Sequence, residues 1–110
     1  MKPRFVGTQF DEIVRFLKEW TRGLFLTRAL IDITPASVAA DSVSEQTFTV
    51  DRLSTNETVF VEYTGAQTAG ILMISARVSA ANTLAITFFN KTAGALTPAS
   101  GEYRLIRMEA

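Results

Sequence analysis

The sequence contains no cysteine and no histidine. Without cysteine there is no disulfide, no thiolate nucleophile and no thiolate-ligated zinc or iron–sulfur site. Without histidine, the usual proton shuttle near neutral pH and the commonest metal ligand are missing. Most acid–base and nucleophilic mechanisms depend on such groups. We therefore expect a protein that is not an enzyme and that has no catalytic residues, no cofactor and no bound metal.

Net charge and long apolar runs are also absent. Eleven Lys and Arg balance eleven Asp and Glu, so no overall field attracts nucleic acid or an anionic membrane surface. Apolar runs such as 71–74 are far shorter than the roughly 20 residues of a membrane-spanning helix. The first residues lack the apolar core of a signal peptide. We expect no nucleic-acid partner, no membrane partner and synthesis in a cytoplasm.

The chain nevertheless has enough apolar material for one core, since 47% of its 110 residues are hydrophobic and 20% are charged. The residue types change near position 33, because Trp20 and four of the eight Phe lie before it. We expect an N-terminal helix and arm over 1–33, acting as an assembly element, and a β-sandwich body over 34–110.

The N-terminal element has the pattern of an amphipathic helix. Thr8 and Asp11 resemble a capping box, and Gly23 fits a helix end, so we expect a helix over about 9–22. Apolar residues then recur at three- and four-residue spacing, which places them on one stripe. The stripe consists of Phe10, Ile13, Leu17, Trp20 and Leu24.

Beyond this element the periodicity changes to two. In 82–90, for example, Leu84, Ile86 and Phe88 share one face of an extended chain. The same reasoning predicts strands near 28–33, 45–53, 57–63, 70–78, 82–90 and 102–108. Thr-Pro-Ala-Ser occurs at 34–37 and at 97–100, and its proline favours an edge or a turn. The expected fold is mainly β: an antiparallel sandwich or barrel of about six strands with an N-terminal α-helix.

The carboxylates show no arrangement typical of a catalytic pair. Glu57 and Glu62 flank the apolar 59–61 segment, and we expect both to be solvated charges that discourage edge pairing. The segment from Asp41 to Glu45 lacks the alternating acids and central glycine of a calcium loop, so a polar loop is expected there.

The N-terminal aromatic and basic residues could stack on bases and bind phosphates. The helical stripe and the neutral charge instead favour packing on protein. Because 24–26 and 29–31 add more apolar area than a small sandwich can hide, we expect a homo-oligomer. The predicted assembly interface comprises Phe10, Ile13, Phe16, Leu17, Trp20, Leu24 and Phe25.

The order of these segments resembles a β-rich module of small virion proteins of tailed bacteriophages. The resemblance covers roughly 31–108 and lies in Ile33-Thr-Pro-Ala-Ser-Val, Glu45-Gln-Thr-Phe-Thr-Val50, Thr58-Val-Phe-Val61 and the segment 76–105. It implies a non-enzymatic virion protein assembled in the host cytoplasm, and specifically a capsid decoration (cement) protein or head-fibre component. The implied partners are the major capsid protein or another virion protein, and further copies of the chain, with a trimer favoured.

Two alternatives remain open at this point. One is a tail or neck component built on the same module. The other is a glycan-binding sandwich that would use Tyr63, Tyr103 and Trp20 on an exposed face, although Trp20 lies on the helical stripe and Tyr63 ends a strand.

Overall fold

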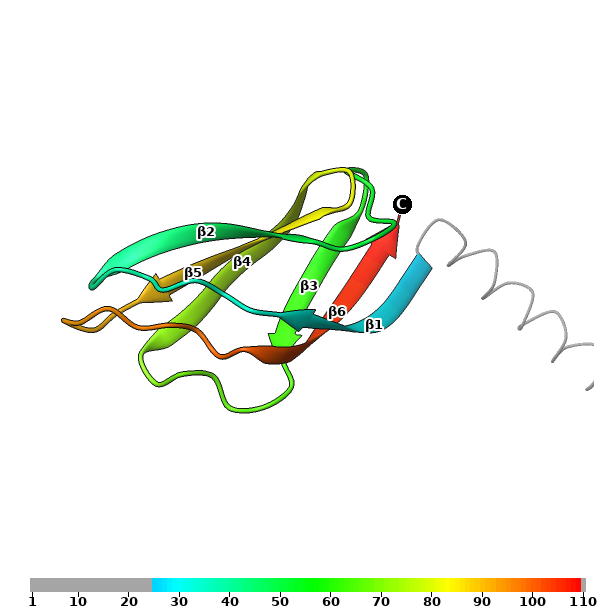
Figure 1. Cartoon of the computed structure of the whole chain (residues 1–110). Helices are drawn as coiled ribbons and strands as arrows, with labels where there is room; N and C mark the ends of the chain where they lie inside the picture. Colours follow the sequence, from blue (N-terminus) through cyan, green and yellow to red (C-terminus); the bar gives the residue numbers. More distant parts are fainter. Residues whose placement is uncertain (1–24, 110) are drawn as a thin grey trace, which may run out of the picture.

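The computed structural model describes residues 25–109, and these form six antiparallel strands in two three-stranded sheets, with no helix (Figure 1). The strands are β1 (Phe25–Ile33), β2 (Ser42–Thr49), β3 (Thr58–Tyr63), β4 (Ile71–Ala80), β5 (Thr83–Asn90) and β6 (Gly101–Glu109). One sheet has the order β1-β6-β3 and the other β2-β5-β4. The expectation of a mainly β fold with six antiparallel strands is confirmed. The helix expected over 9–22 lies outside the described residues.

The two sheets are joined by a ribbon of two antiparallel chain segments. β1 pairs with β6 up to Ile33↔Gly101, and β2 pairs with β5 from Ser42↔Asn90 onward. Between these ladders lie the two Thr-Pro-Ala-Ser segments, followed by a bridge in which Val38 and Leu96 exchange N–H···O bonds of 2.7 and 3.1 Å. Because proline cannot donate a backbone hydrogen bond, the ladder is interrupted there and the ribbon passes from one sheet to the other. The two segments lie outside the strands, as their turn chemistry predicted.

One core lies between the inner faces of the two sheets. β5 supplies Leu84, Ile86 and Phe88, which are fully buried and share one face as the alternation predicted. The opposite sheet contributes Tyr103 and Leu105 from β6. Burial of each large apolar side chain stabilises the fold by about 1.5–3 kcal/mol. The rest of the cluster consists of Ile33, Val38, Leu53, Val59 and Ile71.

The second strand is displaced from its predicted position. It was expected over 45–53 and runs over Ser42–Thr49, so the segment expected to be a polar loop at its start is strand. Its ladder ends at Thr49↔Thr83, the first residue of β5. The chain then turns to bind the tip of the β4–β5 hairpin, where the Asn82 side chain accepts a 2.7 Å hydrogen bond from the N–H of Arg52. Leu53 therefore lies in the core but belongs to a loop and not to a strand.

Candidate functional site

Glu57 corrects one expectation from the sequence. It was predicted to be a solvated charge, but its side chain is 1% exposed and its Oε2 lies 2.7 Å from Nη2 of Arg107. The turn at 54–57 explains the burial: the N–H of Glu57 donates to the Ser54 carbonyl, and Glu57 Oε1 accepts from the Ser54 N–H. The turn is thus closed by one backbone bond and by one bond to the Glu57 side chain, and it directs the carboxylate inward, towards Arg107 of β6.

Two further carboxylates are paired at the surface. Glu62 is exposed, as expected, and accepts a hydrogen bond from Arg104 on the neighbouring strand. Glu45 lies 2.8 Å from Arg77, and the hydrogen bond from this guanidinium lowers the pKa of the Glu45 carboxyl. Such exposed pairs contribute little to stability. Within residues 25–109 no group of three or more acidic side chains is arranged to hold a metal ion.

The tyrosines serve the packing of two loops. Tyr103 is fully buried, and its ring lies 4.8 Å from that of the half-buried Tyr63, centroid to centroid. The Tyr103 hydroxyl donates to the Ala99 carbonyl at 2.6 Å and accepts from Gln67 Nε2 at 3.1 Å. The Tyr63 hydroxyl donates to the Ser100 carbonyl. These contacts tie the β3–β4 loop to the β5–β6 loop, so the pair is not an exposed platform for a sugar. Trp20 lies outside the described residues.

The buried phenol predicts a loss of stability at high pH. Burial raises the pKa of Tyr103 above its ordinary value, so the folded state favours the neutral phenol. The stabilisation that results from the neutral phenol is complete below the pKa of Tyr103 in the unfolded state, about 10. It is lost as pH rises through the pKa of Tyr103 in the folded state. Urea unfolding between about pH 8 and 11 should show this loss. Tyr103→Phe should be less stable than the wild type at pH 8, but its free energy of unfolding should fall less steeply as pH rises. If both proteins lose stability equally with rising pH, the loss does not come from Tyr103.

The outer face of the β1-β6-β3 sheet carries an apolar cluster that no other part of residues 25–109 covers. Side chains directly opposite in an antiparallel pair share a face. Leu26 is opposite Met108, and Ile106 lies between Arg28 on one side and Phe60 on the other. Leu26, Leu30 and Phe60 are 61%, 57% and 55% exposed within the described structure. We call this cluster the apolar face; it consists of Leu26, Leu30, Phe60, Ile106 and Met108.

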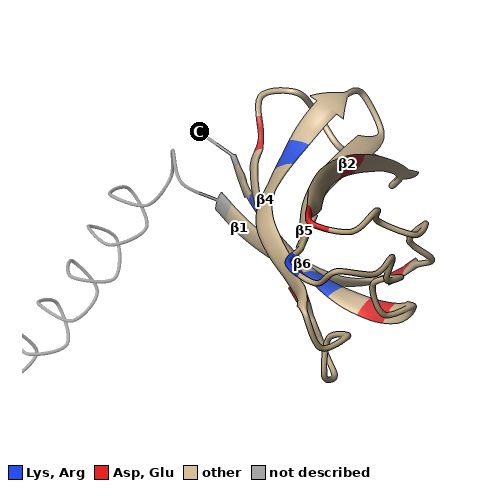
Figure 2. Ribbon diagram, turned by 90° about the vertical axis from the view of Figure 1, so that its left-hand side faces the viewer, with Lys and Arg blue, Asp and Glu red and all other residues tan. Residues whose placement is uncertain are grey.

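The outer face of the other sheet is more polar. One apolar row crosses it, formed by Val43, Phe89 and Leu72. The next row along consists of Glu45, Thr87 and Ser75. Acidic and basic residues are scattered over the strands and are not gathered in an area of one sign (Figure 2). The apolar face contains five apolar residues, and this row contains three.

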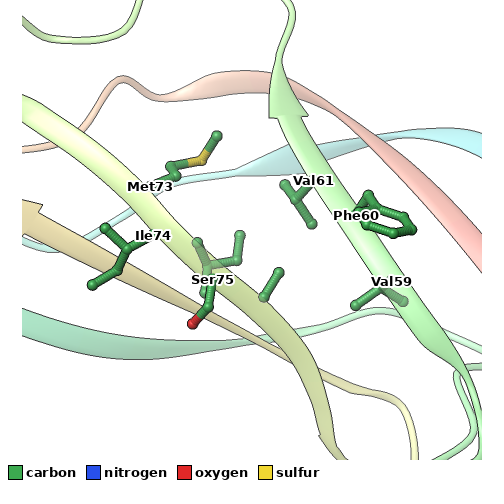
Figure 3. A pocket seen from close by; sticks show the side chains of 8 residues that line it. Val59, Phe60, Val61, Met73, Ile74 and Ser75 are labelled. Atoms are coloured by element: carbon green, nitrogen blue, oxygen red, sulfur yellow. The ribbon is translucent and has the colours of Figure 1, made fainter.

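A third feature is an apolar groove between β3 and β4, the edge strands of the two sheets. The groove encloses about 200 Å³, and Val61 lies on the side of β3 that faces β4 (Figure 3). A β-bulge between Met73 and Ser75 leaves Ile74 53% exposed beside it. The lining is mainly apolar and contains no titratable side chain.

The predicted interface residues Phe10, Ile13, Phe16, Leu17, Trp20 and Leu24 lie outside the described residues. Of Phe25 only the backbone is described; it starts β1 and pairs with Glu109. Sequence reasoning had noted the surplus of apolar residues around Leu26 and Leu30. It missed Phe60, which was counted with the core of its strand. The sequence Val59-Phe60-Val61 could have shown this, because adjacent residues of a strand point to opposite faces of the sheet. If Val59 and Val61 face the core, Phe60 must face outward.

No family model, no curated protein and no solved structure matches this chain. Among residues 25–109, none belongs to a helix that could cross a bilayer.

Proposed function

We propose that this chain is a structural assembly protein without catalytic activity. Within that class, we propose a bacteriophage virion protein, and specifically a capsid decoration (cement) protein that binds the head shell and stabilises it through subunit contacts. The observation that carries the proposal is the apolar face. Large exposed apolar clusters are typical of protein–protein contact surfaces. Three of the described carboxylates, those of Glu45, Glu57 and Glu62, are paired with arginine.

The topology supports this choice by analogy. A ribbon that folds over to give the strand orders β1-β6-β3 and β2-β5-β4 corresponds to a jelly roll with one hairpin fewer. Jelly rolls are common in viral capsid domains and in lectins. A fold alone does not define a function, so the lectin alternative is weighed by its site: Tyr103 is fully buried and Tyr63 is packed against it.

The proposed partners are the major capsid protein or another virion protein, together with further copies of this chain. A trimer is the oligomer that the virion resemblance favours. The N-terminal stripe around Leu17 and Trp20 is proposed to contact a neighbouring subunit or the shell, because an amphipathic helix binds through its apolar side. The β body then projects from the shell or clamps the junction between capsomers.

Co-sedimentation with empty heads of the source phage tests the proposal. The wild-type chain should pellet with heads, and Leu17→Asp with Trp20→Asp should reduce the bound fraction at least about ten-fold, the loss expected when central apolar contacts are replaced by charge. Thermal unfolding of the β body should be unchanged. A wild-type chain that stays in the supernatant with heads but pellets with isolated tails would instead support the tail or neck alternative.

A further inference from the structure

We infer that the apolar face is the contact between copies of this chain, and that Arg28 of one copy pairs with Asp32 of its neighbour. This inference rests on the homo-oligomer in the proposed function and assigns it a surface and a pairing. A contact between two like faces is two-fold and closes as a dimer, so the inferred oligomer differs from the trimer that the virion resemblance favours. The occupant of the face is thus a second copy of the same chain.

Charge on the same sheet face favours a second copy as the partner. Arg28 and Asp32 stand on either side of Leu30, two residues away in each direction, and therefore point to the same face. Both are exposed, and neither forms an ion pair with another residue of 25–109. Arg104, Glu62 and Glu102 add both signs of charge to this face. A surface that carries both signs beside an apolar centre is complementary to another copy of itself.

The spacing of the two charges prevents them from pairing within one copy. Four residues of an extended strand span about 13 Å, so Arg28 and Asp32 of one copy stand too far apart for an ordinary ion pair. When the Leu30 side chains of two copies approach, each copy offers an opposite charge at the border of the contact. Border charges of this kind select the partner and its register more than they add affinity.

The size of the apolar face determines how strongly two copies are expected to associate. Three strands about 4.8 Å apart and about 30 Å long present roughly 400 Å² in projection. A standard stable interface buries about 800 Å² per partner. The face alone therefore supports a weak contact between copies. Association is expected to depend on concentration in the micromolar range.

Sedimentation velocity of the full-length chain over a range of concentrations tests the surface. Leu30→Asp should shift the protein to monomer, raising the dissociation constant at least about 100-fold. Val43→Asp is the matched control, because Val43 is 58% exposed and Leu30 57%, and Val43 lies on the outer face of the other sheet. The control should keep the wild-type mass. Phe60→Asp gives a second test on the apolar face, and circular dichroism establishes that each variant is folded.

Charge reversal tests the pairing. Arg28→Asp and Asp32→Arg should each raise the dissociation constant about ten-fold, and the double variant with both changes should return to within about three-fold of wild type. Because the two side chains stand about 13 Å apart within one copy, recovery in the double variant identifies a contact between copies. Additive losses in the double variant would overturn the pairing.

A wild-type monomer at all concentrations, or a Leu30→Asp variant of unchanged mass, would overturn the surface assignment. Head binding by the same variants separates this inference from the proposed function. If Leu30→Asp keeps its mass but no longer pellets with heads, the face binds the shell and only the inference fails. If Leu30→Asp becomes monomeric while the wild-type oligomer ignores heads, the inference stands and the proposed function fails.

Discussion

Replacing Asn90 by alanine is expected to lower the free energy of unfolding by about 3 kcal/mol, the sum of a buried side chain and lost hydrogen bonds. Asn90 is fully buried at the end of β5. Its Nδ2 donates to the carbonyls of Val38 and Gly94 at 3.0 and 2.8 Å, and its Oδ1 accepts from the N–H and the hydroxyl of Thr92 at 2.9 and 2.7 Å. One amide thus joins both segments of the ribbon where they enter the β2-β5-β4 sheet. Urea unfolding monitored by circular dichroism measures the loss.

Asn90→Asp provides the matched control for this prediction. The carboxylate has the same shape and still accepts from Thr92, but it cannot donate to the Val38 and Gly94 carbonyls. It should be as destabilising as alanine at pH 7 and recover in part at acid pH, where the protonated form regains one donor. If both variants cost less than about 1 kcal/mol, the typical value of a single hydrogen bond, the amide does not organise this region.

Replacing Arg107 by methionine is expected to cost about 3 kcal/mol, because it leaves the Glu57 carboxylate buried without its cation. Arg107 donates to Glu57 Oε2 through Nε at 3.2 Å and through Nη2 at 2.7 Å, and Nη2 also donates to the Arg52 carbonyl. The side chains of Arg107 and Glu57 are 20% and 1% exposed, so water replaces little of this pairing. Chemical denaturation at neutral pH is the appropriate measurement.

The same strand supplies the control. Arg104→Met removes a cation from Glu62, whose side chain is 65% exposed, and should cost less than about 1 kcal/mol. A second comparison combines Arg107→Met with Glu57→Met; removal of both charges should recover part of the loss, since two uncharged side chains carry no desolvation penalty. Equal costs for Arg104→Met and Arg107→Met would contradict the role assigned to burial.

The sequence predicted the strands well where alternation was regular. In β5 the alternating residues Leu84, Ile86 and Phe88 define one inward face, and all three are buried. The prediction was less accurate for β2, because Leu53 extended the apolar pattern beyond the last paired residue, Thr49. Strand ends are set by the length of the partner strand and by turns such as that at Arg52, whose φ is 70°. Neither is a local property of the segment.

The candidate surface was predictable only in part. The apolar surplus near Leu30 indicated assembly, but a single strand does not show which of its residues face inward. Phe60 joins the apolar face because β3 pairs with β6 in the register Phe60↔Ile106, which joins residues far apart in the chain. The burial of Glu57 was missed for the same reason, since its partner Arg107 lies on β6, 50 residues further along the chain.

The central place of β6 in its sheet has a consequence for synthesis. β6 is the last of the six strands to leave the ribosome, yet β1 and β3 have no hydrogen-bonded neighbour in the sheet without it. The nascent chain therefore exposes β1 and β3 unpaired until translation has passed residue 109, and long-range pairing of this kind is slow. Only a chain that has been synthesised through β6 can therefore display the apolar face.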